Sequence, residues 1–196
     1  MLSKHNYGIS MDMVLSDGST IHIFHEYFSN NKIHRYTMFK INQPTVFITC
    51  GIPCSGKSTW IKNTLTPAGF KSISRDDIRL EMYKCKYSDI PFTPQSEHMI
   101  TNVFDNRVTT AITKREDIVL DNTHCRSSYL KEAIYRFAGT DYKIYVVFFD
   151  IPIWKAYLRN IIRYIKEGKW IPKDVMKAMY KNYNKINQKD YDNYKW

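Results

Sequence analysis

One stretch of the sequence combines two glycines, a lysine and a serine at the spacing of a phosphate-binding loop. The run Gly51-Ile-Pro-Cys-Ser-Gly56-Lys57-Ser58 matches the pattern GxxxxGK[ST] without a mismatch. The glycines let the backbone curl so that its N–H groups point at phosphate oxygens. Lys57 can reach the β- and γ-phosphates as a point charge, and the Ser58 hydroxyl suits Mg²⁺. The pattern therefore predicts a site for ATP, or another nucleoside triphosphate, with Mg²⁺.

The segments around this loop have the character that the motif requires. The β-rich run Thr45–Cys50 precedes it, and we expect a helix from about Lys57 to Leu65. The N-terminus of that helix adds a partial positive charge to the phosphate site. The predicted ATP-binding residues of the loop are Gly51, Ile52, Pro53, Cys54, Ser55, Gly56, Lys57, Ser58 and Thr59.

Two aspartates and an arginine follow the next expected strand, residues 70–74. They would lie at the carboxyl edge of the sheet, where open α/β folds bind ligands. A carboxylate there could accept the proton of an attacking hydroxyl, and we predict Asp76 as this base. The alternative is that Asp76 or Asp77 only caps the following helix. Arg79 comes about one helical turn after Asp76 and could hold a phosphate of the acceptor bidentately.

A further aspartate ends the third expected strand, at Leu120-Asp121-Asn122-Thr123. Asp121 could hold Mg²⁺ directly or through water, or it could orient the acceptor instead. Near the C-terminus, Arg159 and Arg163 are four residues apart on an expected helix and so share a face. They could close over the triphosphate as a lid. The alternative is a solvated basic face, because Lys155, Lys166 and Lys169 are nearby.

The elements that must position these residues alternate along the chain. From residue 44 onward, we expect strands at 45–50, 70–74, 117–122 and 142–150, and helices at 57–65, 77–84, 95–114, 127–137, 153–167 and 172–185. Such alternation implies right-handed βαβ units. We therefore predict an α/β fold of the P-loop kinase type, with a doubly wound, mostly parallel sheet of four to five strands and a helical lid. The polar tail QKDYDNYKW is expected to fray.

The first 41 residues follow a different pattern. Residues 21–28 and 32–40 alternate as strands do, with SNN between them. Asp17-Gly18 predicts a hairpin turn, and a strand around Ile9–Leu15 would complete a small antiparallel meander. We thus expect two regions: an N-terminal β meander appendage over 1–41 and a P-loop kinase domain over 42–196. The appendage would either support the main domain or offer nucleic acid an accessory surface.

Composition limits the class of protein. The net charge is +10, which favours a polyanionic partner such as nucleic acid; the alternative is that many lysines are only solvated surface. The sequence contains no run of 18 apolar residues, so we expect no transmembrane helix. The first residues also lack the apolar core of a signal peptide. The four cysteines form no CxxC pair. We expect reduced cysteines and a cytoplasmic location, or the host-cell cytoplasm for a phage or viral protein.

Read in order, several segments resemble one known family. GIPCSGKSTW, SRDDIR, LDNT, FDIP-x6-RN-xx-R and IPKDVMKAMYK are similar to the kinase domain of the phage polynucleotide 5′-kinases, from about Thr45 to Asn184. The resemblance implies transfer of the ATP γ-phosphate to the 5′-hydroxyl end of DNA or RNA, as in nucleic-acid end repair. Many members carry a 3′-phosphatase domain, but no DxDxT motif occurs here. A ligase or phosphatase partner would therefore be a separate chain.

The resemblance also implies roles for individual residues. Asp76 would be the general base for the 5′-hydroxyl, and Arg79 would bind the phosphate on the 3′ side of the acceptor nucleotide. Arg163 would act at the transferring phosphoryl group, with help from Arg159. The catalytic set is then Asp76, Lys57 and Arg163. The predicted acceptor-binding residues are Arg79, Asp121, Asn122, Ile171 and Val175.

Two other functions share these features. A nucleoside or nucleotide kinase that acts on a small molecule would use the same loop and lid. A non-catalytic, nucleotide-dependent adaptor that binds nucleic acid would share the positive charge. DNA and RNA both fit the sequence as acceptors, as do single-stranded and recessed ends.

Overall fold

The computed structural model describes residues 7–14, 20–27, 35–40 and 43–196. The chain divides into two compact units, Met1–Pro44 and Thr45–Trp196, and each is described by itself. In the part of the chain that is described, no helix combines the length and the apolar character needed to cross a membrane.

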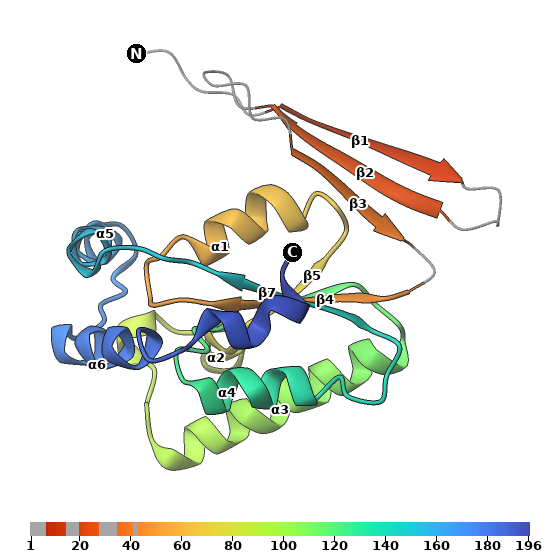
Figure 1. The fold of residues 1–196 in the computed structure, drawn as a ribbon. Helices are drawn as coiled ribbons and strands as arrows, with labels where there is room; N and C mark the ends of the chain where they lie inside the picture. Colours follow the sequence, from red (N-terminus) through yellow and green to blue (C-terminus); the bar gives the residue numbers. More distant parts are fainter. Residues whose placement is uncertain (1–6, 15–19, 28–34, 41–42) are drawn as a thin grey trace. The chain divides into compact units, whose positions relative to one another are not determined.

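The N-terminal unit contains strands β1 (Tyr7–Val14), β2 (Thr20–Tyr27) and β3 (Arg35–Lys40). They pair antiparallel in the order β1-β2-β3 (Figure 1). The predicted turn at Asp17-Gly18 and the predicted loop at 29–31 lie outside the described residues. An appendage role for this unit stays a prediction, whether as a support or as a nucleic-acid surface.

A parallel sheet forms the centre of the second unit. Its strands are β4 (Thr45–Cys50), β5 (Lys71–Ile73), β6 (Ile118–Leu120) and β7 (Lys143–Phe148). They pair in the order β5-β6-β4-β7. β4 is central and buried along its whole length, as its continuous apolar pattern predicts. Because all four strands are parallel, their carboxyl ends meet at one edge of the sheet.

Helices cover both faces of this sheet. The α-helices are α1 (Lys57–Trp60), α2 (Arg75–Tyr83), α3 (Pro94–Thr113), α4 (Ser127–Tyr135), α5 (Ile153–Glu167) and α6 (Lys173–Tyr183). A π-helical segment, η1 (Ile61–Leu65), continues α1. Two 3₁₀-helical segments are η2 (Tyr87–Asp89) and η3 (Gln188–Tyr194). The α1 helix lies on one face and α3 and α4 lie on the other (Figure 1). The predicted doubly wound α/β fold is confirmed.

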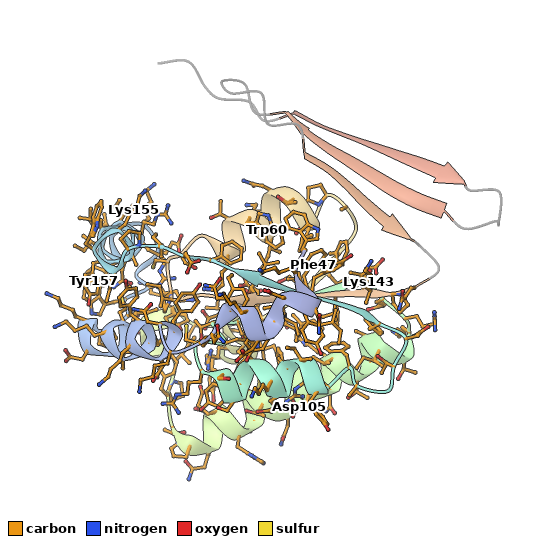
Figure 2. The ribbon with its side chains drawn as sticks, in the orientation of Figure 1. Phe47, Trp60, Asp105, Lys143, Lys155 and Tyr157 are labelled. Carbon is orange, nitrogen blue, oxygen red and sulfur yellow. The ribbon has the colours of Figure 1, made fainter. Side chains whose placement is uncertain are left out.

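Alternation along β4 divides the core between the two faces. Val46 and Ile48 point into an apolar cluster that contains Val108 of α3 and Ala133 of α4. Phe47 points the other way, and its ring centroid lies 5.9 Å from that of Trp60 at the end of α1 (Figure 2). The sheet is thereby fixed between its helices, and the loops at its carboxyl edge start from a rigid base.

The C-terminal tail departs from the expectation that it frays. Tyr191 is buried, and the Trp196 ring lies 5.8 Å from Phe47 and 5.5 Å from Trp60 between centroids. Lys195 also forms a parallel bridge with Val146 of β7. The expectation of fraying was wrong because aromatic side chains spaced along a polar segment pack onto the sheet.

Candidate active site

Two glycines shape the loop between β4 and α1. A Cβ at Gly51 would lie 2.9 Å from Cβ of Phe149 and 3.1 Å from its carbonyl oxygen, so only glycine fits there. Gly56 has φ +108°, a conformation that L side chains rarely adopt. The next residue, Lys57, begins α1, so the loop delivers the chain directly into a helix N-terminus.

The Lys57 side chain lies inside this loop. It is only 7% exposed, and its Nζ donates to the carbonyl oxygens of Gly51 and Ile52, both at 2.9 Å. Burial lowers the pKa of Lys57, and the nearby Asp121 carboxylate opposes that shift. The loop therefore places the Lys57 amine at its centre, where the motif requires it for phosphate.

Ser58 and Asp121 bring two oxygen groups together beside the loop. The Ser58 hydroxyl donates to Oδ2 of Asp121 at 2.6 Å. Asp121 follows β6, and its backbone N–H donates to the carbonyl of Ile73 at 3.0 Å. Burial raises the pKa of Asp121, while Ser58 and Lys57 act against that rise. A hydroxyl next to a carboxylate is the kind of oxygen donor set that Mg²⁺ prefers, so these residues fit the predicted metal.

A short segment after β6 forms hydrogen bonds with the loop and with the end of β4. The N–H of Gly51 donates to the Thr123 carbonyl at 2.9 Å. The next residue, His124, is buried with φ 41°, and its Nδ1 lies 2.8 Å from the carbonyl oxygen of Thr49. Burial lowers the pKa of His124 to about 4, so the ring is neutral near pH 7. His124 thus has a structural role: it holds the segment after β6 against β4.

The second part of the site begins at α2. Ser74 caps this helix, since its side chain accepts a hydrogen bond from the N–H of Asp77 at 3.3 Å. The alternative in which Asp76 or Asp77 acts only as the cap is therefore wrong. The N–H of Arg75 donates to Oδ1 of Asn122 at 3.3 Å, which links the start of α2 to the end of β6.

Three donors converge on the Asp76 carboxylate. Oδ1 accepts from Nη1 of Arg79 at 2.8 Å and from the Tyr87 hydroxyl at 3.2 Å, and Oδ2 accepts from Nζ of Lys169. Burial raises the pKa of Asp76, but Lys169, Arg79 and Tyr87 outweigh it and bring the pKa below its ordinary value. Asp76 is thus ionised near neutral pH and able to accept a proton.

Arg79 is held on two sides. Its Nε and Nη2 donate to the two carboxylate oxygens of Glu97 at 3.0 and 2.7 Å, while Nη1 reaches Asp76. Its guanidinium carbon lies 5.4 Å from the ring centroid of Phe92. The side chain is 11% exposed, so its direction is fixed by these partners. An incoming phosphate would share the guanidinium with Glu97.

The two predicted lid arginines lie on α5. Nη1 of Arg159 donates to the carbonyl of Cys54 in the loop at 3.1 Å, so this residue is not part of a purely solvated face. Arg163 contacts Oδ1 of Asn160 at 3.4 Å through Nη2. Its Nε is buried and makes no hydrogen bond within the described residues. Arg163 is therefore half-buried, while the exposed Arg159 contacts the loop, and a lid role for both stays a prediction.

Asn160 fastens this helix to the segment before α6. It is 1% exposed, its Nδ2 donates to the carbonyl of Ile171 at 2.9 Å, and its Oδ1 accepts from the N–H of Ile171 at 3.3 Å. The intervening residues include Gly168, with φ +67°, and Lys169. Asn160 thereby sets the path of the segment that carries Lys169 to Asp76.

Comparison with known proteins adds the family. The profile of the AAA domain family AAA_33 matches residues 46–186. The chain belongs to this family. The match begins within β4, so the AAA_33 domain contains the loop, the Asp76 region and the two arginines of α5. No curated protein matches the sequence.

Solved structures share the fold of the AAA_33 domain. A chain of the Pnkp1/Rnl/Hen1 RNA repair complex is 24% identical with TM-score 0.66, covering 85% of this chain and 50% of its own. A chain of a second Pnkp1/Rnl/Hen1 complex is 24% identical with TM-score 0.52, and the match covers 67% of this chain and 41% of that chain. A sugar kinase from Janibacter sp. HTCC2649 is 14% identical with TM-score 0.52, and the match covers 74% of this chain and 80% of the sugar kinase. The chain thus spans half or less of the two chains from the Pnkp1 complexes. At these identities the likeness shows the α/β fold of a P-loop kinase.

The predicted site residues form two groups in the AAA_33 domain. The first group surrounds the loop and contains Lys57, Ser58, Asp121 and Arg159. The second group is on α2 and contains Asp76 and Arg79. Ile171 is half-buried against the core, and Val175 is exposed on α6, where its contact with an acceptor stays a prediction. Among the described residues, no cluster of three or more His, Cys, Asp or Glu side chains could hold a metal by itself.

Three site residues escaped the sequence reasoning. Lys169, Glu97 and Tyr87 complete the surroundings of Asp76 and Arg79, but they come from the connection between α5 and α6, from α3 and from η2. Lys169 looked like one more solvated lysine beside the arginines. Its position directly after Gly168, in the segment that leads back to the sheet, was the one local signal that could have marked it.

Proposed function

We propose that this protein is an ATP-dependent polynucleotide 5′-hydroxyl kinase of the phage type, which phosphorylates the 5′ ends of DNA or RNA in end repair. One observation carries the proposal. The ionised Asp76 carboxylate is held between Arg79 on its own helix and Lys169 of the lid segment. The two ion pairs support the proposal because they would join a base, a phosphate-binding arginine and a lid in one network.

On the ATP side, the loop residues Gly51–Thr59 would hold the phosphates. Lys57 would exchange its backbone carbonyl partners for β- and γ-phosphate oxygens, and Arg163 and Arg159 would approach from α5. Ser58, with Asp121 directly or through water, would hold Mg²⁺. When bound, this ion would supply positive charge that offsets the negative charge of the phosphates.

On the acceptor side, Asp76 would take the proton of the 5′-hydroxyl. The oxygen would then bond to the γ-phosphorus in line while the bond from that phosphorus to the β-phosphate oxygen breaks, and ADP would leave. Arg79 would bind the phosphate on the 3′ side of the acceptor nucleotide. Asn122, Ile171 and Val175 would complete the acceptor site.

Two further features support nucleic acid over a smaller acceptor. The net charge of +10 suits a polyanion, because each neutralised phosphate releases counterions. The fold is also shared with a chain of an RNA repair complex. We propose that a separate ligase or phosphatase chain completes end repair, and that the protein acts in the cytoplasm.

A transfer assay with labelled ATP tests the proposal. The acceptors are thymidine, thymidine 3′-phosphate and a 5′-hydroxyl oligonucleotide, and label should enter the last two far better than thymidine. Asp76→Asn should abolish transfer and leave ATP binding nearly intact. The adjacent Asp77→Asn serves as the matched control and should keep at least about half of the activity, since Asp77 receives none of the three donors. Near-wild-type transfer by Asp76→Asn would refute the base assignment.

The rival with specific support is a small-molecule kinase, since a sugar kinase shares the fold over 80% of its own length. It predicts transfer to a nucleoside as efficient as transfer to the oligonucleotide. A non-catalytic adaptor predicts no labelled product and nucleic-acid affinity that survives Lys57→Ala. The same acceptor panel therefore separates all three functions.

A further inference from the structure

Phe92 is an exposed aromatic residue whose backbone is held in place by its neighbours. Its side chain is 57% exposed, although Ile90, two residues earlier, is buried. Pro91 and Pro94 flank it and restrict the backbone. On the C-terminal side, Thr93 caps α3 in a reciprocal capping box with Ser96.

The hydroxyl of Ser96 adds to this frame. Ser96 is 3% exposed, and its Oγ lies 2.5 Å from the carbonyl oxygen of Pro91 and 2.9 Å from that of Thr93. The residues on both sides of Phe92 are therefore tied to the same buried hydroxyl. The ring is presented at a fixed place on the surface, as in a preorganised binding group.

That place is next to the candidate acceptor site. The Phe92 ring centroid lies 5.4 Å from the guanidinium carbon of Arg79 and 5.8 Å from the ring centroid of Tyr87. Arg79 and Tyr87 both donate to Asp76. Asp76, Arg79 and Phe92 thus follow one another as a base, a phosphate-binding cation and an exposed aromatic ring.

This order matches the order of groups along the start of a nucleic-acid strand. A 5′-hydroxyl is followed by the first sugar, then by the phosphate on its 3′ side, and then by the second nucleotide with its base. With the hydroxyl at Asp76 and the phosphate at Arg79, the second base falls within reach of Phe92. With Arg79 and Tyr87 beside it, more than half of the Phe92 surface is still exposed.

We propose that Phe92 is the stacking platform for the second nucleobase of the acceptor strand. This inference rests on the proposed function and extends it to a substrate class. Aromatic rings stack on any base with little sequence preference, so the site accepts all four. A base inside a duplex is already stacked on both faces and paired. Acceptors with an unpaired second nucleotide are therefore preferred over blunt or recessed ends.

The test compares kcat/KM for phosphate transfer to two acceptors. Thymidine 3′-phosphate ends at the phosphate that Arg79 binds, whereas the dinucleotide TpT adds a second base. Phe92→Ala should lower kcat/KM for TpT roughly tenfold, the loss expected for one stacked base, and change it less than about threefold for thymidine 3′-phosphate. Phe92→Trp should restore transfer to TpT. Tyr135→Ala, which removes an exposed ring on α4, is the matched control and should leave both values unchanged.

A trinucleotide with an abasic second position gives the reciprocal test. Loss of that base should cost the wild type roughly tenfold and cost Phe92→Ala almost nothing. Equal losses on TpT and thymidine 3′-phosphate would mean that Phe92 only positions Arg79, and no loss on either would mean that no base stacks there. Either result overturns the inference while transfer itself persists. Absence of transfer by the wild type to every acceptor would overturn the proposed function as well.

Discussion

Asp76 and Lys169 are 93 positions apart in the sequence and form an ion pair that joins α2 to the segment between α5 and α6. Lys169 also lies over the ring of Tyr87, with its Nζ 4.0 Å from the ring centroid. The lysine therefore belongs to the surroundings of the proposed base. The segment between α5 and α6 thus helps to lower the pKa of the proposed base.

Lys169→Met should move the acid side of the pH–rate profile to higher pH. Lys169 lowers the pKa of Asp76, so its removal raises that pKa, and the carboxylate becomes protonated at a higher pH. Transfer needs the ionised form, so kcat/KM for an oligonucleotide should decline earlier as pH falls. Lys166→Met, an exposed lysine on α5, is the control. An acid limb at the same pH in both variants would contradict the role of Lys169.

Ser58→Ala and Asp121→Asn should each raise the Mg²⁺ concentration needed for half-maximal transfer by about tenfold or more. The two side chains share the hydrogen bond that places both oxygens beside the loop. The measurement is a MgCl₂ titration of transfer at fixed ATP. Asp105→Asn on α3 controls for the loss of one negative charge. An unchanged Mg²⁺ requirement in Asp121→Asn would return Asp121 to the acceptor-orienting alternative.

Asn160→Ala should lower the free energy of unfolding by roughly 2 kcal/mol or more, because the N–H and C=O of Ile171 lose a buried partner. Urea unfolding measures the change. The exposed Asn184→Ala is a control and should change stability by less than about 0.5 kcal/mol. Stability equal to that of Asn184→Ala would show that Asn160 does not hold the lid segment.

His124 should make stability fall as the pH is lowered from about 6.5 to 4. The unfolded chain binds a proton on His124 near pH 6.5, whereas burial lowers the folded pKa to about 4. Over this interval the unfolded state binds more protons, so the free energy of unfolding decreases, by roughly 3 kcal/mol at pH 4. The check is a series of urea unfolding curves between pH 4 and pH 7.

Variants isolate the contribution of His124 from that of other titrating groups. His124→Gln should flatten the pH dependence of stability whatever its absolute stability, while the exposed His98→Gln should keep the wild-type slope. The same slope in His124→Gln as in the wild type would assign the pH dependence to other residues.

The nucleotide half of the site could be predicted because its parts are contiguous. A buried strand, a glycine turn and a helix follow one another over Thr45–Leu65, so local sequence determines their geometry. The arginines of α5 were also within reach, since a spacing of four residues places Arg159 and Arg163 on one helix face.

The acceptor half could be predicted only in part, because its contacts are between distant elements. Glu97 binds Arg79 from a different helix, and Lys169 reaches Asp76 from the segment between α5 and α6. No periodicity links such residues, and a lysine in a basic segment looks the same whether solvated or paired. The tail was mispredicted for a related reason, since Trp196 finds its partners only on the folded sheet.

Asn160 has a thermodynamic consequence for nucleotide binding. It fastens α5 to Ile171, and α6, which follows, is anchored by the fully buried Met176. The helix that carries Arg159 and Arg163 is thus already fixed to the core. Calorimetry of Mg·ATP binding should accordingly find a small change in heat capacity, set by the ligand's own contact area, rather than the large decrease that accompanies folding of a segment around its ligand.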